Sequence, residues 1–218
     1  MAWLFYIVWP FVSSFFKTIF LSWRKKGLKK LPEGGLIFAA NHNSNAEGAL
    51  LNTIRYRPVR FLGKEELFKK PIHGFIQRGL GTIPLKRGKS DKAAMEKAVN
   101  ALKNGKWIGI FPEGTRGDGR ELGEAHTGVI RLALMADVPI VPVGISGGTR
   151  AWPKGKKPRL FKKVHVLIGD PWKVPPPPEG REYTYDELKR LAEELLYDRI
   201  GTLWDRSKEE PLPRHQDR

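Results

Sequence analysis

The chain has 218 residues, 40% of them hydrophobic, which is enough for a buried core and excludes disorder over most of its length. Lys and Arg number 39 against 23 Asp and Glu, giving a formal net charge of +16, so we expect an anionic partner: nucleic acid or an acidic membrane. The chain contains no Cys, which excludes disulfides, thiolate metal ligands and a Cys nucleophile.

The first residues form an apolar segment. Residues 1–16 carry no charged side chain, and after Lys17 the apolar character resumes to residue 23. The positive charges follow this run, which is the reverse of the order in a secretory signal peptide. Sixteen helical residues span about 24 Å, short of a hydrocarbon core of about 30 Å. Pro10 also kinks a helix, so we do not expect a clean transmembrane span.

Aromatic residues beside a basic cluster instead favour a helical segment that lies within one leaflet. A buried core helix is the second interpretation, ranked lower because aromatics occupy every helix face and basic residues follow at once. We therefore expect residues 1–30 to form a membrane-anchoring helical segment with a basic flank. Its expected membrane-binding residues are Trp3, Phe5, Trp9, Phe15, Phe16, Phe20, Trp23, Arg24, Lys25 and Lys26.

Apolar runs alternate with helical patterns through the middle of the chain. One helix is expected between an N-cap at Ser90 and a stop at Gly105, and another over residues 129–136. The alternation predicts an α/β fold with a central, largely parallel sheet flanked by helices. The predicted strands are residues 36–40, 107–111, 140–143 and 164–168.

The C-terminal part begins with four prolines at residues 175–178, which form a stiff surface link. Thr184 and Glu187 make a capping box, and the apolar stripe that follows predicts a terminal helix packed on the sheet. We expect the α/β domain to span residues 31–206 and a polar tail to follow at 207–218.

Residues 41–47, Asn-His-Asn-Ser-Asn-Ala-Glu, lie directly after a predicted strand and before a helical stretch. In such a turn His42 and Glu47 can meet, and the carboxylate then fixes the imidazole tautomer and leaves the other ring nitrogen as a base. For this segment by itself, a His that only caps the loop with hydrogen bonds is the favoured interpretation.

A second segment, residues 111–116 or Phe-Pro-Glu-Gly-Thr-Arg, changes that weighting because it also follows a strand. Gly114 and Thr115 allow a tight turn, Glu113 can order it, and Arg116 offers a planar fork to a phosphate. Neighbouring strands of a parallel sheet end at one edge, so we expect the two segments to share a crevice.

With these residues in place, the chain resembles the 1-acylglycerol-3-phosphate acyltransferases among the glycerolipid acyltransferases. Four blocks occur in the family's order: residues 41–47, then Gly63 and Lys64 with Leu67, Pro71, Gly74, Gly81 and Arg87, then residues 111–116 and 138–143. The resemblance implies transfer of a fatty acyl group from acyl-CoA or acyl-ACP to the free hydroxyl of a lysophospholipid. It also implies a peripheral or monotopic protein at the cytoplasmic face of the cell membrane, with lysophosphatidic acid as the favoured acceptor.

On this interpretation His42 removes the hydroxyl proton, Glu47 stabilises the imidazolium, and no covalent acyl-enzyme forms. The expected substrate-binding residues are Lys64, Arg87, Glu113, Gly114, Thr115 and Arg116. We expect no metal site, no cofactor beyond the acyl thioester co-substrate, and no nucleic acid. Two positions depart from the family pattern: Glu47 stands where Asp is usual, and His126 replaces a common Lys.

Two other functions compete with this one. Residues 144–148 satisfy the Gly-x-Ser-x-Gly pattern, so a serine hydrolase or thioesterase using Ser146 is the enzymatic alternative. It is disfavoured because residues 149–155 do not suit the required helix, and only Asp170 with His165 or His215 follows. A non-enzymatic basic module that binds nucleic acid or a membrane is the other, supported mainly by the net charge.

Overall fold

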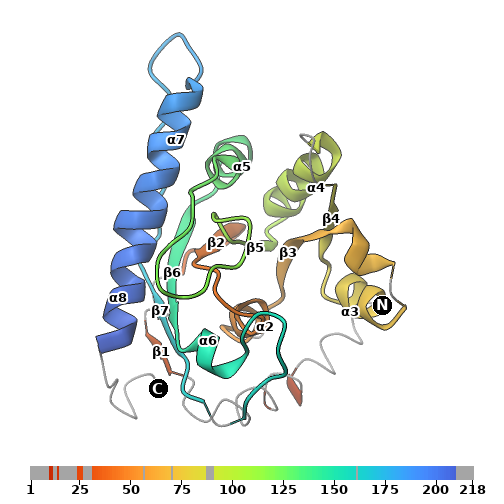
Figure 1. Ribbon diagram of the computed structural model, residues 1–218. Coiled ribbons are helices and arrows are strands. Elements are labelled where there is room, and N and C mark those ends of the chain that lie inside the picture. The colour runs from red at the N-terminus through yellow and green to blue at the C-terminus, as the bar shows by residue number, and fades with distance from the viewer. Residues whose placement is uncertain are drawn as a thin grey trace.

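The computed structural model describes residues 10, 11, 14, 24–26, 31–55, 57–69, 71–86, 91–160 and 162–209. Within this part of the chain, seven strands form one sheet in the order β1-β7-β6-β2-β5-β3-β4 (Figure 1). Strand β7 pairs antiparallel with β6 and every other pairing is parallel, so the predicted α/β fold with a largely parallel sheet is confirmed. The strands are β1 Arg24–Lys26, β2 Leu36–Ala40, β3 Val59–Lys64, β4 Ile83–Leu85, β5 Trp107–Ile110, β6 Ile140–Ser146 and β7 His165–Ile168.

Helices cover both faces of this sheet. In chain order they are α2 Glu47–Asn52, the 3₁₀ helix η2 Glu65–Phe68, α3 Pro71–Gly79, α4 Lys92–Lys103, α5 Gly128–Ala136, α6 Gly148–Ala151, α7 Tyr185–Glu193, the π-helical η3 Glu194–Gly201 and α8 Thr202–Glu209. The last three make one long helix along the side of the molecule (Figure 1). Among the described residues, no helix is both long enough and apolar enough to cross a membrane.

Strand β2 is buried on both sides, which places the centre of the core. Ile37 and Ala39 pack in one cluster with residues of α4, α5, α7 and η3. Leu36, Phe38 and Ala40 alternate with them and pack against α2 and α6 on the other face. Because β2 lies between β5 and β6, the loops that follow β2 and β5 leave the same edge of the sheet.

Several sequence predictions require correction. Residues Arg24–Lys26, expected in the basic flank of the anchor segment, form the edge strand β1, which pairs with β7, so the sheet begins before residue 31. Backbone pairing with an available sheet edge overrides the pattern of the side chains there. At the other end α8 continues to Glu209 with Ser207 buried, three residues beyond the expected boundary at 206. Strands β3 and β4 were not predicted.

The N-terminal cap of α7 is the predicted one, whereas that of α4 is a different residue. Thr184 and Glu187 form the predicted capping box at the start of α7. Helix α4 is capped by Asp91, whose side chain accepts a hydrogen bond from the Ala94 N–H, rather than by Ser90, which lies outside the described residues. The expected anchor residues Trp3, Phe5, Trp9, Phe15, Phe16, Phe20 and Trp23 also lie outside them.

The close approach of α8 to the sheet gives a test of this packing. A methyl group at Gly144 of β6 would overlap the backbone of Leu203 and Trp204, so Gly144→Ala must push α8 away from the sheet. We expect it to lower the free energy of unfolding by about 1–3 kcal/mol in urea denaturation. The control Gly128→Ala adds its methyl to open space at the start of α5, and we expect neutrality or a gain of up to about 1 kcal/mol. Equal stability of the two variants would contradict this packing.

Candidate active site

Asn41, the first residue after β2, fixes the loop that leads to α2. Its side chain is fully buried and bonds the backbone of Ile145 twice, donating from Nδ2 to the carbonyl oxygen at 2.9 Å and accepting the N–H at Oδ1 at 2.7 Å. A paired amide of this kind replaces a backbone ladder where β2 ends. The loop that carries His42 therefore starts from a fixed point on β6.

His42 and Glu47 meet across this loop, as their spacing predicts. Nδ1 of His42 lies 2.7 Å from Oε2 of Glu47, and the Asn43 N–H donates to both carboxylate oxygens at 3.0 and 2.9 Å. A carboxylate only accepts hydrogen bonds, so Nδ1 is the donor, and in a neutral imidazole with this tautomer Nε2 carries the lone pair. Glu47 is fully buried whereas the His42 side chain is 20% exposed. The imidazole is therefore bonded to a buried carboxylate and is itself accessible to solvent.

The imidazole also rests on an aromatic stack that the sequence did not indicate. The rings of His42 and Phe111 are stacked with centroids 3.9 Å apart and planes 11° apart. Phe111 in turn stacks on Phe61 of β3 at 5.8 Å and 11°. A side chain at Gly109, the β5 partner of Phe61, would overlap the Phe61 ring. Phe61 belongs to a strand without a continuous apolar run, so nothing in the spacing pointed to it.

Glu113 ties the Phe-Pro-Glu-Gly-Thr-Arg loop to the His42 loop. Its buried carboxylate accepts the His42 backbone N–H at 2.6 Å and the Gly123 N–H at 2.8 Å. The Gly117 N–H donates a hydrogen bond to the His42 carbonyl oxygen at 2.8 Å. The two segments thus lie together at one sheet edge, as expected, and Glu113 orders both loops. Burial raises the pKa of the Glu113 carboxyl, as does the nearby Glu47 charge, although the two N–H donors oppose the shift.

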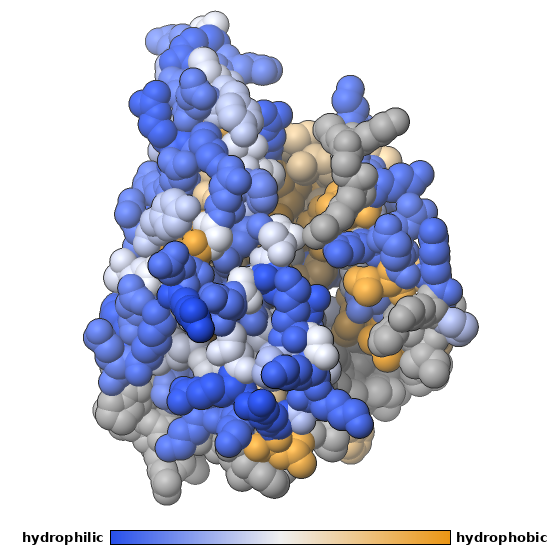
Figure 2. Space-filling model, viewed as in Figure 1, coloured by the Kyte–Doolittle hydropathy of each residue, from blue (hydrophilic) through white to orange (hydrophobic). Residues whose placement is uncertain are grey.

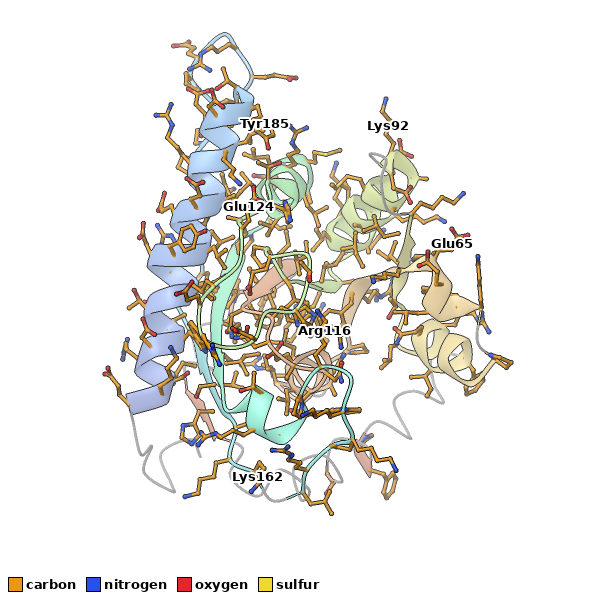
Figure 3. The ribbon with its side chains drawn as sticks, viewed as in Figure 1. Glu65, Lys92, Arg116, Glu124, Lys162 and Tyr185 are labelled. Carbon is orange, nitrogen blue, oxygen red and sulfur yellow. The ribbon has the colours of Figure 1, made fainter. Side chains whose placement is uncertain are left out.

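Arg116 lies close to the same loop. Its guanidinium donates from Nη1 to Oδ1 of Asn45, and Asn45 Nδ2 donates to the Pro153 carbonyl at 3.3 Å. Figure 3 shows Arg116 near the middle of the molecule, where the loops after β2 and β5 come together. Gly114, with φ of 63°, lies in the turn that follows β5, and the neighbouring Thr115 is exposed. Arg116 is partly exposed, so its guanidinium is positioned while retaining access to solvent.

The remaining expected substrate-binding residues are not gathered in this way. Lys64 is exposed at the end of β3, and Arg87 lies outside the described residues. His126 is exposed, and its ring lies across Gly114, 3.0 Å from where a β-carbon there would be. Within the described part of the chain, no three His, Asp or Glu side chains come together as a metal site.

Ser146 does not have the geometry of a hydrolase nucleophile. The residue ends β6 and is buried, and its hydroxyl donates to the Ser207 carbonyl at 2.8 Å. His165 Nδ1 lies 3.0 Å from the same carbonyl oxygen. The hydroxyl proton is therefore bound to backbone rather than to a base, and α6 that follows has only four residues.

Comparison with known proteins identifies the family of this chain. The model of the acyltransferase family matches residues 22–146, more than half of the chain. The chain belongs to the acyltransferase family. The match confirms the resemblance carried by the four sequence blocks, two of which are the loops just described.

Within the family the chain is similar to two proteins of Pseudomonas aeruginosa. It is 30% identical to the 1-acyl-sn-glycerol-3-phosphate acyltransferase over 147 residues, which is 66% of this chain and 56% of the relative. It is 33% identical to the lyso-ornithine lipid O-acyltransferase over 116 residues, 53% of this chain and 44% of the relative. The chain thus spans about half the length of these curated relatives.

A solved structure is similar over more of the chain. The crystal structure of the 1-acyl-sn-glycerophosphate (LPA) acyltransferase PlsC from Thermotoga maritima has a TM-score of 0.72 and 27% sequence identity. The similarity covers 93% of this chain and 80% of that one. The family's fold therefore extends across nearly the whole chain.

The raised pKa of Glu113 predicts how stability changes with pH. The folded state binds the Glu113 carboxyl proton more tightly than the unfolded chain does. The contribution of this group to the free energy of unfolding is therefore fully present below the ordinary pKa of 4.5 and is lost as the pH rises above it. Urea denaturation from about pH 4 to pH 8 should show this fall, and Glu113→Gln should flatten it.

Glu124 supplies the matched control because its pKa is shifted in the opposite direction. The hydrogen bond and charge of Lys189 lower the Glu124 pKa, so its contribution is present above 4.5 and is lost below it. Glu124→Gln should therefore leave the fall above pH 4.5 unchanged. If Glu113→Gln and the unmodified chain have the same slope there, Glu113 is not the group responsible.

Proposed function

We propose that this protein transfers a fatty acyl group from an acyl thioester to the free hydroxyl of 1-acylglycerol 3-phosphate, giving phosphatidic acid. The observation that carries the proposal is the His42–Glu47 pair, an outward-facing imidazole bonded to a fully buried carboxylate. The family and the names of the similar proteins support the reaction class and the acceptor.

In the proposed reaction, Nε2 of His42 takes the proton from the acceptor hydroxyl as its oxygen attacks the thioester carbonyl. A C–O bond forms and the C–S bond breaks. The thiolate then receives the proton from the imidazolium, so the base is regenerated. The Glu47 carboxylate stabilises the imidazolium between these two proton transfers and keeps the ring in the required tautomer.

Direct transfer of this kind depends on the position of the base rather than on a covalent intermediate. His42 is held at three points: by Glu47 at its ring, by Phe111 beneath its ring, and by Glu113 at its backbone. Because the base is already held in position, the reaction step avoids part of the entropy loss of bringing base, alcohol and thioester together from solution. The geometry therefore supports acid–base catalysis on an already activated acyl donor.

Arg116 is the proposed ligand of the acceptor's phosphate. Its guanidinium reaches the His42 loop through Asn45, and Arg pairs with phosphate through two parallel hydrogen bonds. Glu113, Gly114 and Thr115 are proposed to shape this part of the site, with Lys64 and Arg87 as further cations. The donor is proposed to be acyl-CoA or acyl-ACP, bound as a co-substrate.

We also propose that the enzyme works as a peripheral or monotopic protein at the cytoplasmic face of the cell membrane. The apolar segment of residues 1–23 and the basic residues that follow support this location. Lysolipid and acyl chain both partition into a bilayer, so a site held at the interface meets them at high local concentration.

The proposed roles of His42 and Glu47 are tested by an assay of acyl transfer to 1-acylglycerol 3-phosphate, in which the released thiol is measured. His42→Ala should lose roughly 10²–10⁴-fold in kcat, because the proton has no acceptor. Glu47→Gln should fall in the same range, because an amide neither fixes the tautomer nor stabilises the imidazolium.

The matched variant is Ser146→Ala, whose hydroxyl bonds only backbone, and it should keep most of the activity. A hydrolase would behave in the opposite way. Loss of activity in Ser146→Ala with a normal melting temperature, together with full activity in His42→Ala, would overturn the proposed mechanism.

The proposed role of Arg116 is tested with two acceptors, 1-acylglycerol 3-phosphate and 1-acylglycerol, which lacks the phosphate. Arg116→Ala should lower kcat/KM for the phosphate-bearing acceptor by about 10–100-fold, since a charge-assisted hydrogen bond contributes about 1.5–3 kcal/mol. The same variant should change kcat/KM for 1-acylglycerol little. Arg120→Ala, at a side chain that is 89% exposed, is the control and should affect neither acceptor. Equal losses for the two acceptors would exclude a phosphate contact.

A further inference from the structure

Three large apolar side chains are exposed on η2 and α3, two elements that pack against each other. They are Leu67, 40% exposed, with Phe75 and Ile76, 65% and 46% exposed. We call them the η2–α3 patch. Figure 2 shows hydrophobic surface in this region, bordered by hydrophilic side chains. The other large exposed apolar side chains in the described residues are separated along the chain: Phe11, Met135, Leu160, Tyr185 and Tyr197. Scattered residues are ordinary on a protein surface, whereas a group is a mark of interaction.

The fold holds Phe75 and Ile76 of α3 outward. Helix α3 packs on η2 through Gly74, where any side chain would overlap the backbone of Phe68. Its C-terminal turn is fixed to β4, because Thr82 donates from Oγ1 to Gln77 Oε1 at 2.7 Å and from its N–H to the Gln77 carbonyl at 2.9 Å. With Gly74 and Gln77 engaged on the inner side, Phe75 and Ile76 cannot turn into the core without unfolding the helix.

The charge around the patch is positive. Residues 64–86 contain the basic residues Lys64, Lys69, Lys70, Arg78 and Lys86 against two acidic ones, Glu65 and Glu66. Lys64, Lys69, Arg78 and Lys86 are exposed. Apolar side chains on a short helix with flanking Lys and Arg suit the boundary between headgroups and acyl chains of an anionic bilayer.

We propose that the η2–α3 patch is a lipid-bilayer contact that inserts Leu67, Phe75 and Ile76 into an anionic leaflet. Its residues lie outside the sequence segment 1–23, on which the expected membrane anchor rests. The inference deepens the proposed function, and it rests on that function only for its consequence: the patch sets the height of the site above the bilayer. Strand β3 links the two, since Phe61 supports Phe111 beneath His42 and the same strand ends at Lys64, next to η2.

A single-cysteine experiment tests the contact without any acyl transfer. Since the chain has no native Cys, Phe75→Cys in the full chain labels uniquely with an environment-sensitive fluorophore. Tyr185→Cys is the matched control, because Tyr185 is 63% exposed and lies on α7, away from α3 (Figure 3). With vesicles of equal phosphatidylcholine and phosphatidylglycerol, the label at 75 should shift to the blue and be quenched by brominated acyl chains. The label at 185 should do neither.

Three results would overturn the proposal. The first is an unchanged label at 75 while the protein co-sediments with the vesicles. The second is an apolar environment at 75 in dilute protein before any lipid is added, which means that the chain itself covers the patch. The third is a blue shift that follows protein concentration without lipid, which means that a second copy covers it.

A substitution provides the functional readout. The full chain with Phe75→Ser and Ile76→Ser should partition into the same vesicles about tenfold more weakly, equivalent to about 1.4 kcal/mol, with Tyr185→Ser as control. Its kcat/KM should fall for acceptor embedded in vesicles and stay unchanged for a short-chain, monodisperse acceptor. If the unmodified chain transfers no acyl group to either acceptor, the proposed function fails, while the fluorescence still decides the contact. Unchanged partitioning of the double variant overturns the contact alone.

Discussion

The buried carboxylate of Glu47 is the constraint on which the site depends. A carboxylate removed from water is costly unless its charge is met by donors, and here the Asn43 N–H and the His42 ring supply them. The backbone of Gly148 also approaches closely: a β-carbon there would lie 3.0 Å from Glu47 Oε1 and 2.7 Å from Ser44 Oγ. The start of α6 thus packs closely over the carboxylate, and the partly exposed His42 ring bonds it from the other loop position.

The sheet order explains why this pair meets the second loop. Strand β2 lies between β6 and β5, and the residues after it are fastened to both neighbours. Asn41 bonds the backbone of β6, while the His42 backbone bonds Glu113 and Gly117 in the loop after β5. A shift of either neighbouring strand would therefore move the imidazole. The proposed base is positioned by the central strands themselves, which are the most buried elements of the described structure.

The sequence predicted those parts of the fold in which one kind of local signal dominates. Strands β2, β5 and β6 are continuous apolar runs, and the capping box at Thr184 and Glu187 is a local pattern with one geometry. Strand β3 mixes Arg60 and Lys64 with apolar residues because it is only partly covered, so its pattern resembles a loop. The three-residue β1 is defined by its partner β7 and by nothing in its own side chains.

The site shows the same division. His42 and Glu47 are five residues apart in one turn, so their contact follows from local geometry. The stack of His42, Phe111 and Phe61 joins three separate segments, and no spacing encodes it. Ser146 illustrates the converse: its flanking glycines match a hydrolase motif, yet α8 returns from 61 residues away to bind its hydroxyl. A motif specifies chemistry only when the fold leaves its functional atom free.

The proposed reaction also constrains how the molecule meets its substrates. An amphiphilic acceptor presents its hydroxyl near the headgroup level, so the base must be held at that height for attack to be frequent. A single point of attachment would leave the body of the protein free to rotate about that point, and the base would then sample many heights. A second contact through η2 and α3 removes that freedom, because these elements continue directly from the strand whose Phe61 supports the His42 stack. On this argument the membrane orientation and the position of the base are set by one rigid unit.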